Sequence, residues 1–292
     1  PLPLVLWHGL GDNFAADGVN NVLDLASTIH PGTVTYAIRL GDDASSDRSS
    51  SYFGNTTSQI EAVCDAITSH PVLSKAPAID ALGSSQGGLL LRGMIQRCGD
   101  RVKVRSLVTF GSPHSGISTF QDCEPTNLLC HFAFGLLQEN TWSRFIQGRL
   151  VPAQYYRTLN ESTGEPTEEY LKYSNLLADV NNERGVKNET YKDHLSRLER
   201  FVMYRFEEED AVIPPESTWF ADVWQKPAPD GDEGTDERIV TPLKERKMYE
   251  EDWLGLRKLD EKDALEFRTI PGKHMQIGKE VLRDAFKNYF GP

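Results

Sequence analysis

A serine with a glycine two residues away on each side stands at position 85 of this 292-residue chain. Residues 79–82 resemble a short buried strand and residues 89–98 carry a helical pattern, so Gly83-Ser84-Ser85-Gln86-Gly87 joins a strand to a helix. Such a G-x-S-x-G turn needs small residues where strand and helix approach, and it projects the middle serine above the sheet. A Gly/Ser-rich turn without a function is the alternative. The strand–turn–helix context favours Ser85 as a nucleophile.

Expected strands and helices alternate along the first 110 residues, and strand patterns resume after residue 200. Strands are predicted at 4–7, 33–38, 79–82, 104–110, 201–206 and 267–270, and helices at 19–29, 57–68 and 89–98. This alternation indicates the α/β class, with a mostly parallel central sheet and helices on both faces. Together with the serine turn it predicts an α/β-hydrolase fold. The length fits one large domain with an insertion, or two small domains, and we expect residues 1–292 to form one domain.

Residues 115–198 show helices and loops but no convincing strand. We therefore expect an inserted helical cap, which is locally rich in apolar side chains. These are Leu128, Leu129, Phe132, Phe134, Leu136, Leu137, Trp142, Phe145 and Ile146. Residues 227–237 are polar and contain glycine, proline and several acids, which predicts an exposed loop.

A serine hydroxyl is a weak nucleophile unless a base takes its proton. His274 follows the last expected strand and is the predicted base. His8, at the tip of the first strand, is interpreted as shaping a loop that donates a backbone N–H. The acid should follow the penultimate strand, because this fold places its catalytic residues in the order serine, acid, histidine. Its candidates are Glu207, Glu208, Glu209 and Asp210.

Two backbone N–H groups should bind the oxyanion that forms when the serine attacks. One is expected from Gln86, the residue after the nucleophile. The other is expected from the loop 8–11, where we assign Leu10. The chain has no HExxH, no CxxC pair and no phosphate-binding glycine loop. We therefore predict neither a metal nor a cofactor.

The formal net charge of −12 argues weakly against a nucleic-acid partner. No stretch approaches the roughly 20 apolar residues of a membrane span. No signal peptide is visible, so the chain is either cytosolic or has lost a leader. Three Asn-x-Ser/Thr sequons begin at Asn55, Asn160 and Asn188.

The four cysteines, Cys64, Cys98, Cys123 and Cys130, allow three pairings. The first two fall on expected helices beside the Ser85 turn, and the spacing of the last two suits a small loop staple. Together with the sequons they favour the secretory route. Four free buried thiols in a cytosolic enzyme are the alternative.

Several segments resemble the lysosomal palmitoyl-protein thioesterases of type 1, in the order of that family and over nearly the whole chain. The segment Ala178-Asp-Val-Asn-Asn-Glu-Arg-Gly185 is far more specific than the G-x-S-x-G turn. The matching segments are 1–12, 83–88, 96–98, 149–151, 177–185, 201–203, 219–220, 254–256 and 274–276.

The resemblance implies that the chain removes palmitate and similar acyl groups from protein cysteines in the lysosome or vacuole, or after secretion. It makes the cap over 115–198 an acyl-chain groove. Net charge and hydropathy, rather than the resemblance, are the reasons why we expect no nucleic-acid partner and no integral membrane segment. The implied residues are Ser85 and His274 as nucleophile and base, Leu10 and Gln86 as oxyanion donors, and the disulfides Cys64–Cys98 and Cys123–Cys130.

The chain departs from the family pattern at two places. An aspartate usually stands three residues after the phenylalanine that matches Phe206, but Glu209 stands here, followed by Asp210. We favour Glu209, and a one-residue bulge would instead present Asp210. Phe14-Ala15 replaces adjacent cysteines that some members carry.

The function that we expect is hydrolysis of fatty acyl thioesters through an acyl-serine intermediate. A lipase or carboxylesterase that acts on oxygen esters is one alternative. A non-catalytic fatty-acyl-binding protein is the other.

Overall fold

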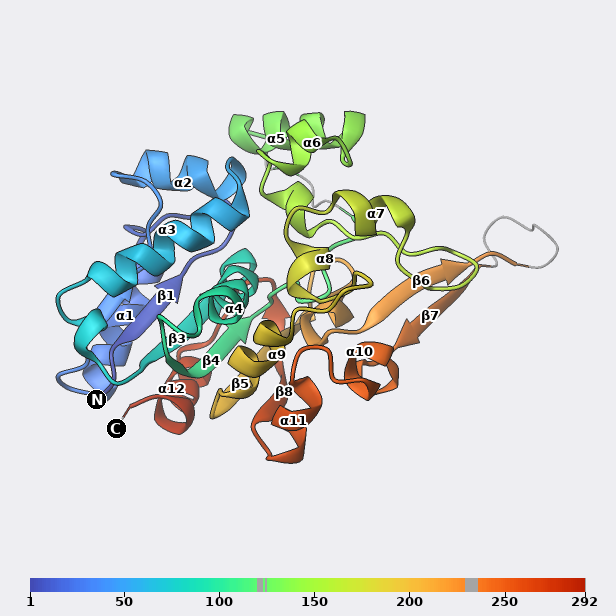
Figure 1. Ribbon diagram of the computed structural model, residues 1–292. Coiled ribbons are helices and arrows are strands. Elements are labelled where there is room, and N and C mark those ends of the chain that lie inside the picture. Colours follow the sequence, from blue (N-terminus) through green and yellow to red (C-terminus); the bar gives the residue numbers. More distant parts are fainter. Residues whose placement is uncertain (120–122, 124, 229–235, 292) are drawn as a thin grey trace.

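Six parallel strands form the central sheet of the computed structural model, which describes residues 1–119, 123, 125–228 and 236–291 (Figure 1). Every neighbouring pair of strands in this sheet is parallel. In spatial order the strands are β2 (Thr35–Ala37), β1 (Leu4–Trp7), β3 (Ile79–Ser84), β4 (Val104–Phe110), β5 (Arg200–Glu208) and β8 (Leu265–Lys273). The predicted mostly parallel sheet is confirmed.

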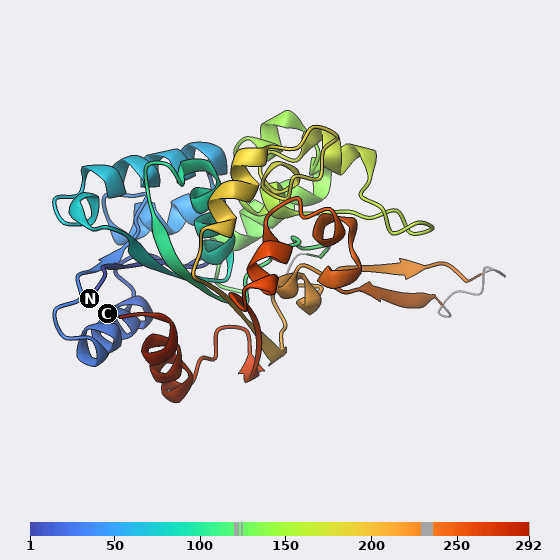
Figure 2. The same ribbon diagram turned by 60° about the horizontal axis from the view of Figure 1, so that its bottom comes forward.

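Side chains of each strand alternate between two apolar layers, as the period of a strand requires. Leu4 and Leu6 of β1 pack in one core cluster with α1 and α12. Val5 and Trp7 pack in another cluster with α3 and α4. Figure 2 shows α1 and α12 below the sheet and the blue-green helices above it. Helices therefore cover both faces, as the alternation of elements predicts.

The helices of the sheet domain are α1 (Asp17–Ile29), α2 (Ala44–Tyr52), α3 (Thr56–Ser69), α4 (Gln86–Cys98), α10 (Lys247–Glu250), α11 (Leu256–Glu261) and α12 (Lys279–Tyr289). Short 3-10 turns lie at η1 (Leu73–Lys75), η3 (Pro215–Trp219) and η4 (Leu243–Glu245). No helix in these described ranges has both the length and the hydropathy of a membrane span.

The stretch between β4 and β5 holds α5 (Leu128–Asn140), α6 (Arg144–Gln147), η2 (Pro152–Tyr155), α7 (Glu168–Tyr173), α8 (Leu177–Val180) and α9 (Glu189–Ser196). α5 and α6 lie at the top of the molecule in Figure 1, and α5 contacts α2. α9 instead packs against α4. The last helix of the expected cap therefore belongs to the layer that covers the sheet.

Four buried charged side chains fasten this stretch to the chain beyond β5. Glu183 lies 2.6 Å from Arg157 and 3.0 Å from Arg246. Asp222 lies 2.5 Å from Arg157 and 2.9 Å from Arg246. Each buried charge therefore has two opposite partners, which offsets the cost of removing it from water. Glu183 belongs to the specific segment 178–185, whose structural role is thereby visible.

Several elements lie where the sequence patterns predicted none. They include α2, α12 and an antiparallel hairpin of β6 (Asp222–Lys226) and β7 (Glu237–Thr241), which projects to the right in Figure 1. α2 and the hairpin are polar, so apolar periodicity does not mark them. α12 does carry an apolar face at helical spacing, and its helix was missed although the pattern is present; the buried residues of this face are Leu282, Ala285, Phe286 and Tyr289. Glu237, expected in an exposed loop, begins β7. Residues 229–235 of that loop lie outside the described residues.

The strand–helix turn at residue 85 depends on close approach between backbones. A Cβ atom on Gly83 would lie 2.2 Å from the Gly88 Cα, and one on Gly87 would lie 2.1 Å from the Trp7 carbonyl oxygen. Both neighbours are backbone atoms of packed elements and cannot rotate away. The glycines at 83 and 87 thus let α4 begin directly beside β1 and β3.

We expect Gly87→Ala to lower the free energy of unfolding by about 1–3 kcal/mol or more, because its methyl group would displace β1. Gly135→Ala is the control. Among the described residues, no atom outside its chain neighbours and the backbone of α5 lies within 4 Å of a Cβ there, and the position is inside α5. It should stabilise the protein by about 0.5–1 kcal/mol through backbone entropy. Urea unfolding measures both, and equal effects of the two substitutions would contradict the packing argument.

Candidate active site

Ser85 stands at the tip of β3 in a strained conformation, with φ 51° and ψ −126°. A positive φ is uncommon for a residue with a side chain, and such strain persists only where neighbours enforce it. The Ser85 N–H donates to the Phe110 carbonyl at 2.7 Å, and its carbonyl accepts from the Gly88 N–H at 3.1 Å. These bonds fix the turn between β3 and α4.

His274 follows β8 and reaches the serine. Its Nε2 lies 2.9 Å from the Ser85 Oγ, and its Nδ1 lies 2.8 Å from a Glu209 carboxylate oxygen. The ring also packs edge-on against Phe206 at 5.7 Å between centroids. An ionised carboxylate only accepts, so Nδ1 carries the proton and Nε2 is free to accept the serine proton.

Of the four consecutive acids after β5, Glu209 is the one bonded to the imidazole. Its side chain is fully buried, and its Oε1 accepts the N–H groups of Ala211 and Val212 at 2.9 Å each. Asp210 is half-exposed, lies 3.2 Å from Lys273, and accepts the backbone N–H of His274 at 3.4 Å. Glu207 and Glu208 are exposed.

The two expected oxyanion donors flank Ser85. Gln86 is the first residue of α4, and Leu10 lies in the loop after β1. Within the described chain, neither backbone N–H donates to a protein acceptor. A Cβ on Gly9 would lie 3.0 Å from the Ser85 Cβ, so this loop is in contact with the nucleophile. The arrangement leaves both N–H groups available to a developing negative charge.

Ser85, His274 and Leu10 line a cleft of about 670 Å³. This volume lies within the roughly 300–1,000 Å³ of small-molecule sites. On the side of the inserted stretch its walls are Ile117, Phe134, Pro152 and Tyr155. On the other side it is bordered by α1 and α12, through Val22, Leu25 and Leu282. The serine therefore opens into a largely apolar cleft.

The apolar residues that predicted the cap have different environments. Phe134 lines the cleft, whereas Leu137 and Ile146 are buried with Leu150 within the stretch itself. Leu128, Phe132 and Phe145 are exposed to 79%, 61% and 60%. Local apolar density did not distinguish the side chains that face the cleft from those that are buried or exposed elsewhere.

Both disulfides join the expected partners. Cys64 on α3 pairs with Cys98 at the end of α4, and Cys123 pairs with Cys130 on α5. The alternative of four free thiols is therefore wrong. Among the described residues, Glu61 together with Cys64 and Cys98 has the donor spacing of a metal site. Those two sulfurs are joined to each other, so they offer no thiolate ligand.

The three sequon asparagines are accessible in part or fully. Asn160 and Asn188 are exposed, and Asn55 is partly buried as the N-cap of α3. Glycosylation at these positions remains a prediction.

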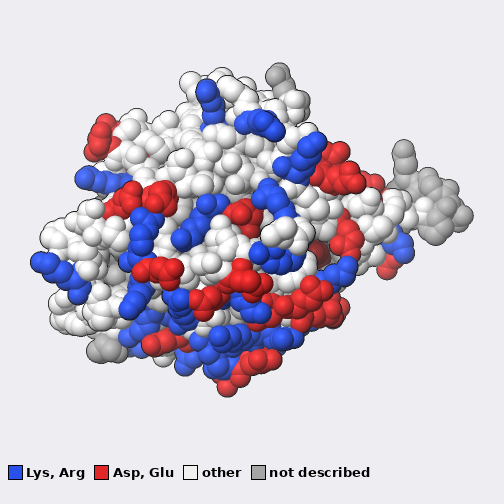
Figure 3. Space-filling view, in the orientation of Figure 1, with Lys and Arg blue, Asp and Glu red and all other residues white. Residues whose placement is uncertain are grey.

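On the face shown in Figure 3, basic side chains are interspersed with acidic ones.

Asp47 was not singled out from the sequence. Its carboxylate lies 2.8 Å from His8 Nε2. The residue lies on the unpredicted, serine-rich α2, far along the chain from His8. No sequence pattern could have found this pairing.

A model of the palmitoyl protein thioesterase family matches residues 3–274. Palmitoyl-protein thioesterase 1 of Caenorhabditis elegans is 33% identical over 99% of this chain and 92% of its own length. A palmitoyl-protein thioesterase–dolichyl pyrophosphate phosphatase fusion of Schizosaccharomyces pombe is 39% identical over 94% of this chain, which spans only 41% of that protein. A lysosomal thioesterase PPT2 homolog of Drosophila melanogaster is 26% identical over 99% of this chain and 91% of its own length.

The contacts of Glu209 predict a large effect of Glu209→Gln. The amide oxygen would keep the two backbone N–H bonds, so the amide nitrogen would face His274 and force the proton onto Nε2. The imidazole could then no longer accept from Ser85, and kcat should fall by roughly 10⁴-fold. Asp210→Asn is the control and should change kcat by less than about threefold. It removes only the exposed ion pair between Asp210 and Lys273, and such a pair contributes little free energy. Steady-state hydrolysis of a fatty acyl thioester measures both. A larger loss in Asp210→Asn would assign the catalytic carboxylate to residue 210.

Proposed function

The chain belongs to the palmitoyl protein thioesterase family, and on this premise we propose that it hydrolyses fatty acyl thioesters on protein cysteines through an acyl-serine intermediate. One observation carries the proposal: Ser85, His274 and Glu209 form a continuous hydrogen-bonded chain that opens into an apolar cleft. Substrates of this kind are S-palmitoylated proteins. The reaction needs no cofactor.

In the acylation step, the Ser85 Oγ attacks the thioester carbonyl carbon while His274 Nε2 takes the hydroxyl proton. The buried Glu209 carboxylate stabilises the imidazolium that results. The N–H groups of Leu10 and Gln86 bind the oxyanion, and loss of one such donor typically costs about 3 kcal/mol. The C–S bond then breaks, His274 returns the proton to the sulfur, and the cysteine thiol leaves.

In the deacylation step, water takes the place of the thiol. His274 removes a proton from the water as it attacks the acyl-serine carbonyl, and the same two N–H groups bind the second oxyanion. The bond to Ser85 Oγ then breaks, and His274 gives the proton back to the serine. The products are the fatty acid and the free enzyme.

The cap over 115–198 supplies the proposed acyl-chain groove. Ile117, Phe134, Pro152 and Tyr155 line the cleft from that side. Each methylene that leaves water for such a surface contributes about 0.8 kcal/mol. Affinity should therefore rise with acyl-chain length until the groove is filled.

Two observations support a lysosomal, vacuolar or extracellular location. Both disulfides are of the kind that persists in oxidising compartments. A related protein from Drosophila melanogaster is named a lysosomal thioesterase. Glycosylation of Asn55, Asn160 and Asn188 would accompany this route.

A direct comparison of two substrates tests the function. We expect a palmitoyl-cysteine peptide to be hydrolysed faster than the matching palmitoyl ester of a serine peptide, because a thiol leaves more readily than an alcohol. Ser85→Ala should abolish both activities. A fluorophosphonate should modify Ser85 in the wild type, as mass spectrometry would show.

The outcomes separate the alternatives. Equal or faster cleavage of the oxygen ester would indicate a lipase or carboxylesterase. Binding of palmitate without turnover and without fluorophosphonate modification would indicate a non-catalytic acyl-binding protein. Unchanged turnover in Ser85→Ala would overturn the assignment of the nucleophile.

A further inference from the structure

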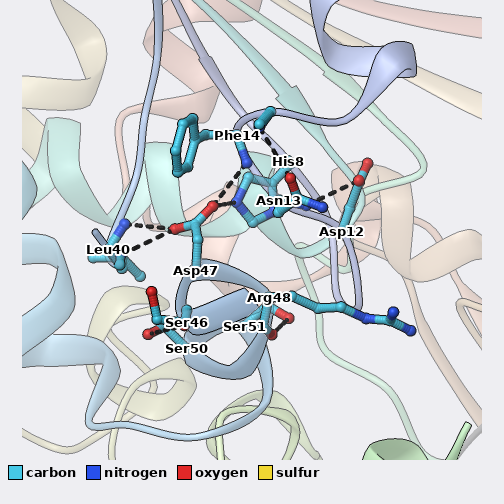
Figure 4. Close-up of polar contacts among 12 residues, drawn as sticks. His8, Asp12, Asn13, Phe14, Leu40, Ser46, Asp47, Arg48, Ser50 and Ser51 are labelled. Carbon is cyan, nitrogen blue, oxygen red and sulfur yellow. Dashed lines mark hydrogen bonds and ion pairs between the residues drawn. The ribbon is translucent and has the colours of Figure 1, made fainter. Parts of the chain in front are cut away.

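His8 is buried directly beside the loop that carries Leu10, with only 4% of its surface exposed. Its Nε2 lies 2.8 Å from the Asp47 Oδ2, and its Nδ1 lies 3.0 Å from the Gly9 carbonyl oxygen (Figure 4). A carboxylate and a carbonyl are both acceptors, so both ring nitrogens must donate. A neutral imidazole has only one N–H. The geometry therefore requires His8 to be an imidazolium.

Asp47 is held as a carboxylate by four donors. Its Oδ2 accepts from His8 and from the Phe14 N–H at 2.8 Å. Its Oδ1 accepts from the N–H groups of Leu40 at 2.6 Å and Gly41 at 3.3 Å. Figure 4 shows this carboxylate between His8, Phe14 and Leu40. Asp47 thus ties α2 to the loop after β1 and to the segment after β2.

The titration directions of the pair agree with this geometry. Burial alone would lower the pKa of His8, but the bonds to Asp47 and to the Gly9 carbonyl, with the charges of Asp47 and Asp12, raise it above the usual value. Burial would raise the pKa of Asp47, but the bonds to His8 and to the backbone N–H groups lower it. Asp47 from α2 and Asp12 from the loop are the charged groups that act on His8.

The Gly9 carbonyl and the Leu10 N–H belong to one peptide group. A trans peptide is planar, and its C=O and N–H point in opposite directions. The bond from His8 therefore fixes the direction of the Leu10 N–H as well. The Gly9 carbonyl also accepts from the Asp12 N–H, at 3.3 Å. These two bonds hold the carbonyl end of the peptide, while the partly buried Leu10 side chain and the Gly11 N–H, which donates to the Ser51 Oγ at 2.8 Å, hold the loop that follows.

We propose that the His8 imidazolium is a positioning residue that holds the Gly9–Leu10 peptide with the Leu10 N–H directed toward the oxyanion. Loss of the His8 proton releases that peptide. This inference rests on the proposed function. It adds a charged group that acts on the reaction only through the backbone of the oxyanion loop.

The charge on His8 decides whether both bonds exist. A neutral His8 keeps its proton on Nε2, where the bond to a carboxylate is stronger than one to a carbonyl. Nδ1 then presents a lone pair to the Gly9 oxygen, and the two repel. Because the pKa of His8 is raised in the folded protein, the bond is present below that raised pKa and is lost as pH rises through it.

Oxyanion binding exists only in the transition state, so loss of the bond should lower kcat and leave KM nearly unchanged. His8→Gln keeps a donor but loses the charge and one of the two bonds. We expect kcat to fall by about 10²-fold, the lower end for loss of one oxyanion donor. The affinity for a palmitoyl trifluoromethyl ketone, whose serine adduct carries an oxyanion, should fall by the same factor. The affinity for palmitate should not change.

His194 supplies a matched control. It is also buried, its Nδ1 lies 2.8 Å from the Gln96 carbonyl oxygen, and its Nε2 lies 3.0 Å from Asp100 without hydrogen-bond geometry. This histidine lies on α9, away from the oxyanion loop. His194→Gln should lower stability as His8→Gln does, with kcat and ketone affinity unchanged.

NMR of the wild-type protein with ¹⁵N-labelled histidine tests the charge directly. Both ring nitrogens of His8 should be protonated where the enzyme is active, and kcat should decline as pH rises through the pKa of His8 that the same NMR titration measures. This decline should be absent in His8→Gln. The measurement also decides the matter if His8→Gln does not fold.

Two results would overturn the inference. One is a neutral His8 in the fully active enzyme. The other is a folded His8→Gln that retains wild-type kcat and ketone affinity. Either could occur while the wild type hydrolyses palmitoyl thioesters through Ser85, which would leave the proposed function intact. Absence of that hydrolysis would instead remove the proposed function, and the charge on His8 would still be measured.

Discussion

The contact between the start of α4 and the ends of β1 and β3 is the constraint on which the site depends. The Cβ position of Gly87 falls 2.1 Å from the Trp7 carbonyl oxygen, so no larger residue permits this approach. That contact brings the loop 8–11 next to the first turn of α4. Both then lie beside the Ser85 side chain at the end of β3. Since all strands of the central sheet run parallel, β5 and β8 end at the same edge of that sheet, and the segments after them bring Glu209 and His274 to it.

Charge is arranged in three buried groups around the site. In the proposed mechanism, Glu209 stabilises the positive charge that His274 gains when it takes the Ser85 proton. His8 and Asp47 lie 2.8 Å apart beside the loop 8–11 and carry opposite charges below the pKa of His8. Arg157, Arg246, Glu183 and Asp222 form a balanced set farther away. Each group joins segments from different parts of the chain, so these buried charges also fix how the segments are placed relative to one another.

Short-range patterns in the sequence predicted the elements that local residue order determines. Strands β1 and β4 agree with their expected bounds, because apolar runs bounded by turn residues mark them clearly. The polar elements α2, β6 and β7 were not predicted, because tertiary contacts stabilise them and their sequences show no apolar periodicity. The choice between Glu209 and Asp210 depends on loop geometry after β5, where the register with β8 shifts between Phe206 and Glu208. The pairing of His8 with Asp47 is set by folding in three dimensions and left no local signal.

The insertion between β4 and β5 also affects the order in which the chain is able to fold. Ser106 of β4 pairs with Arg200 of β5, and the whole stretch of α5 to α9 lies between them in sequence. During synthesis, the side of β4 that pairs with β5 therefore stays unpaired until residues beyond 200 emerge. This strand contains the apolar residues Leu107, Val108 and Phe110. Parallel pairings of such long range form slowly, and open apolar edges invite association with other chains. The insertion therefore lengthens the time for which this side of β4 stays without its native partner.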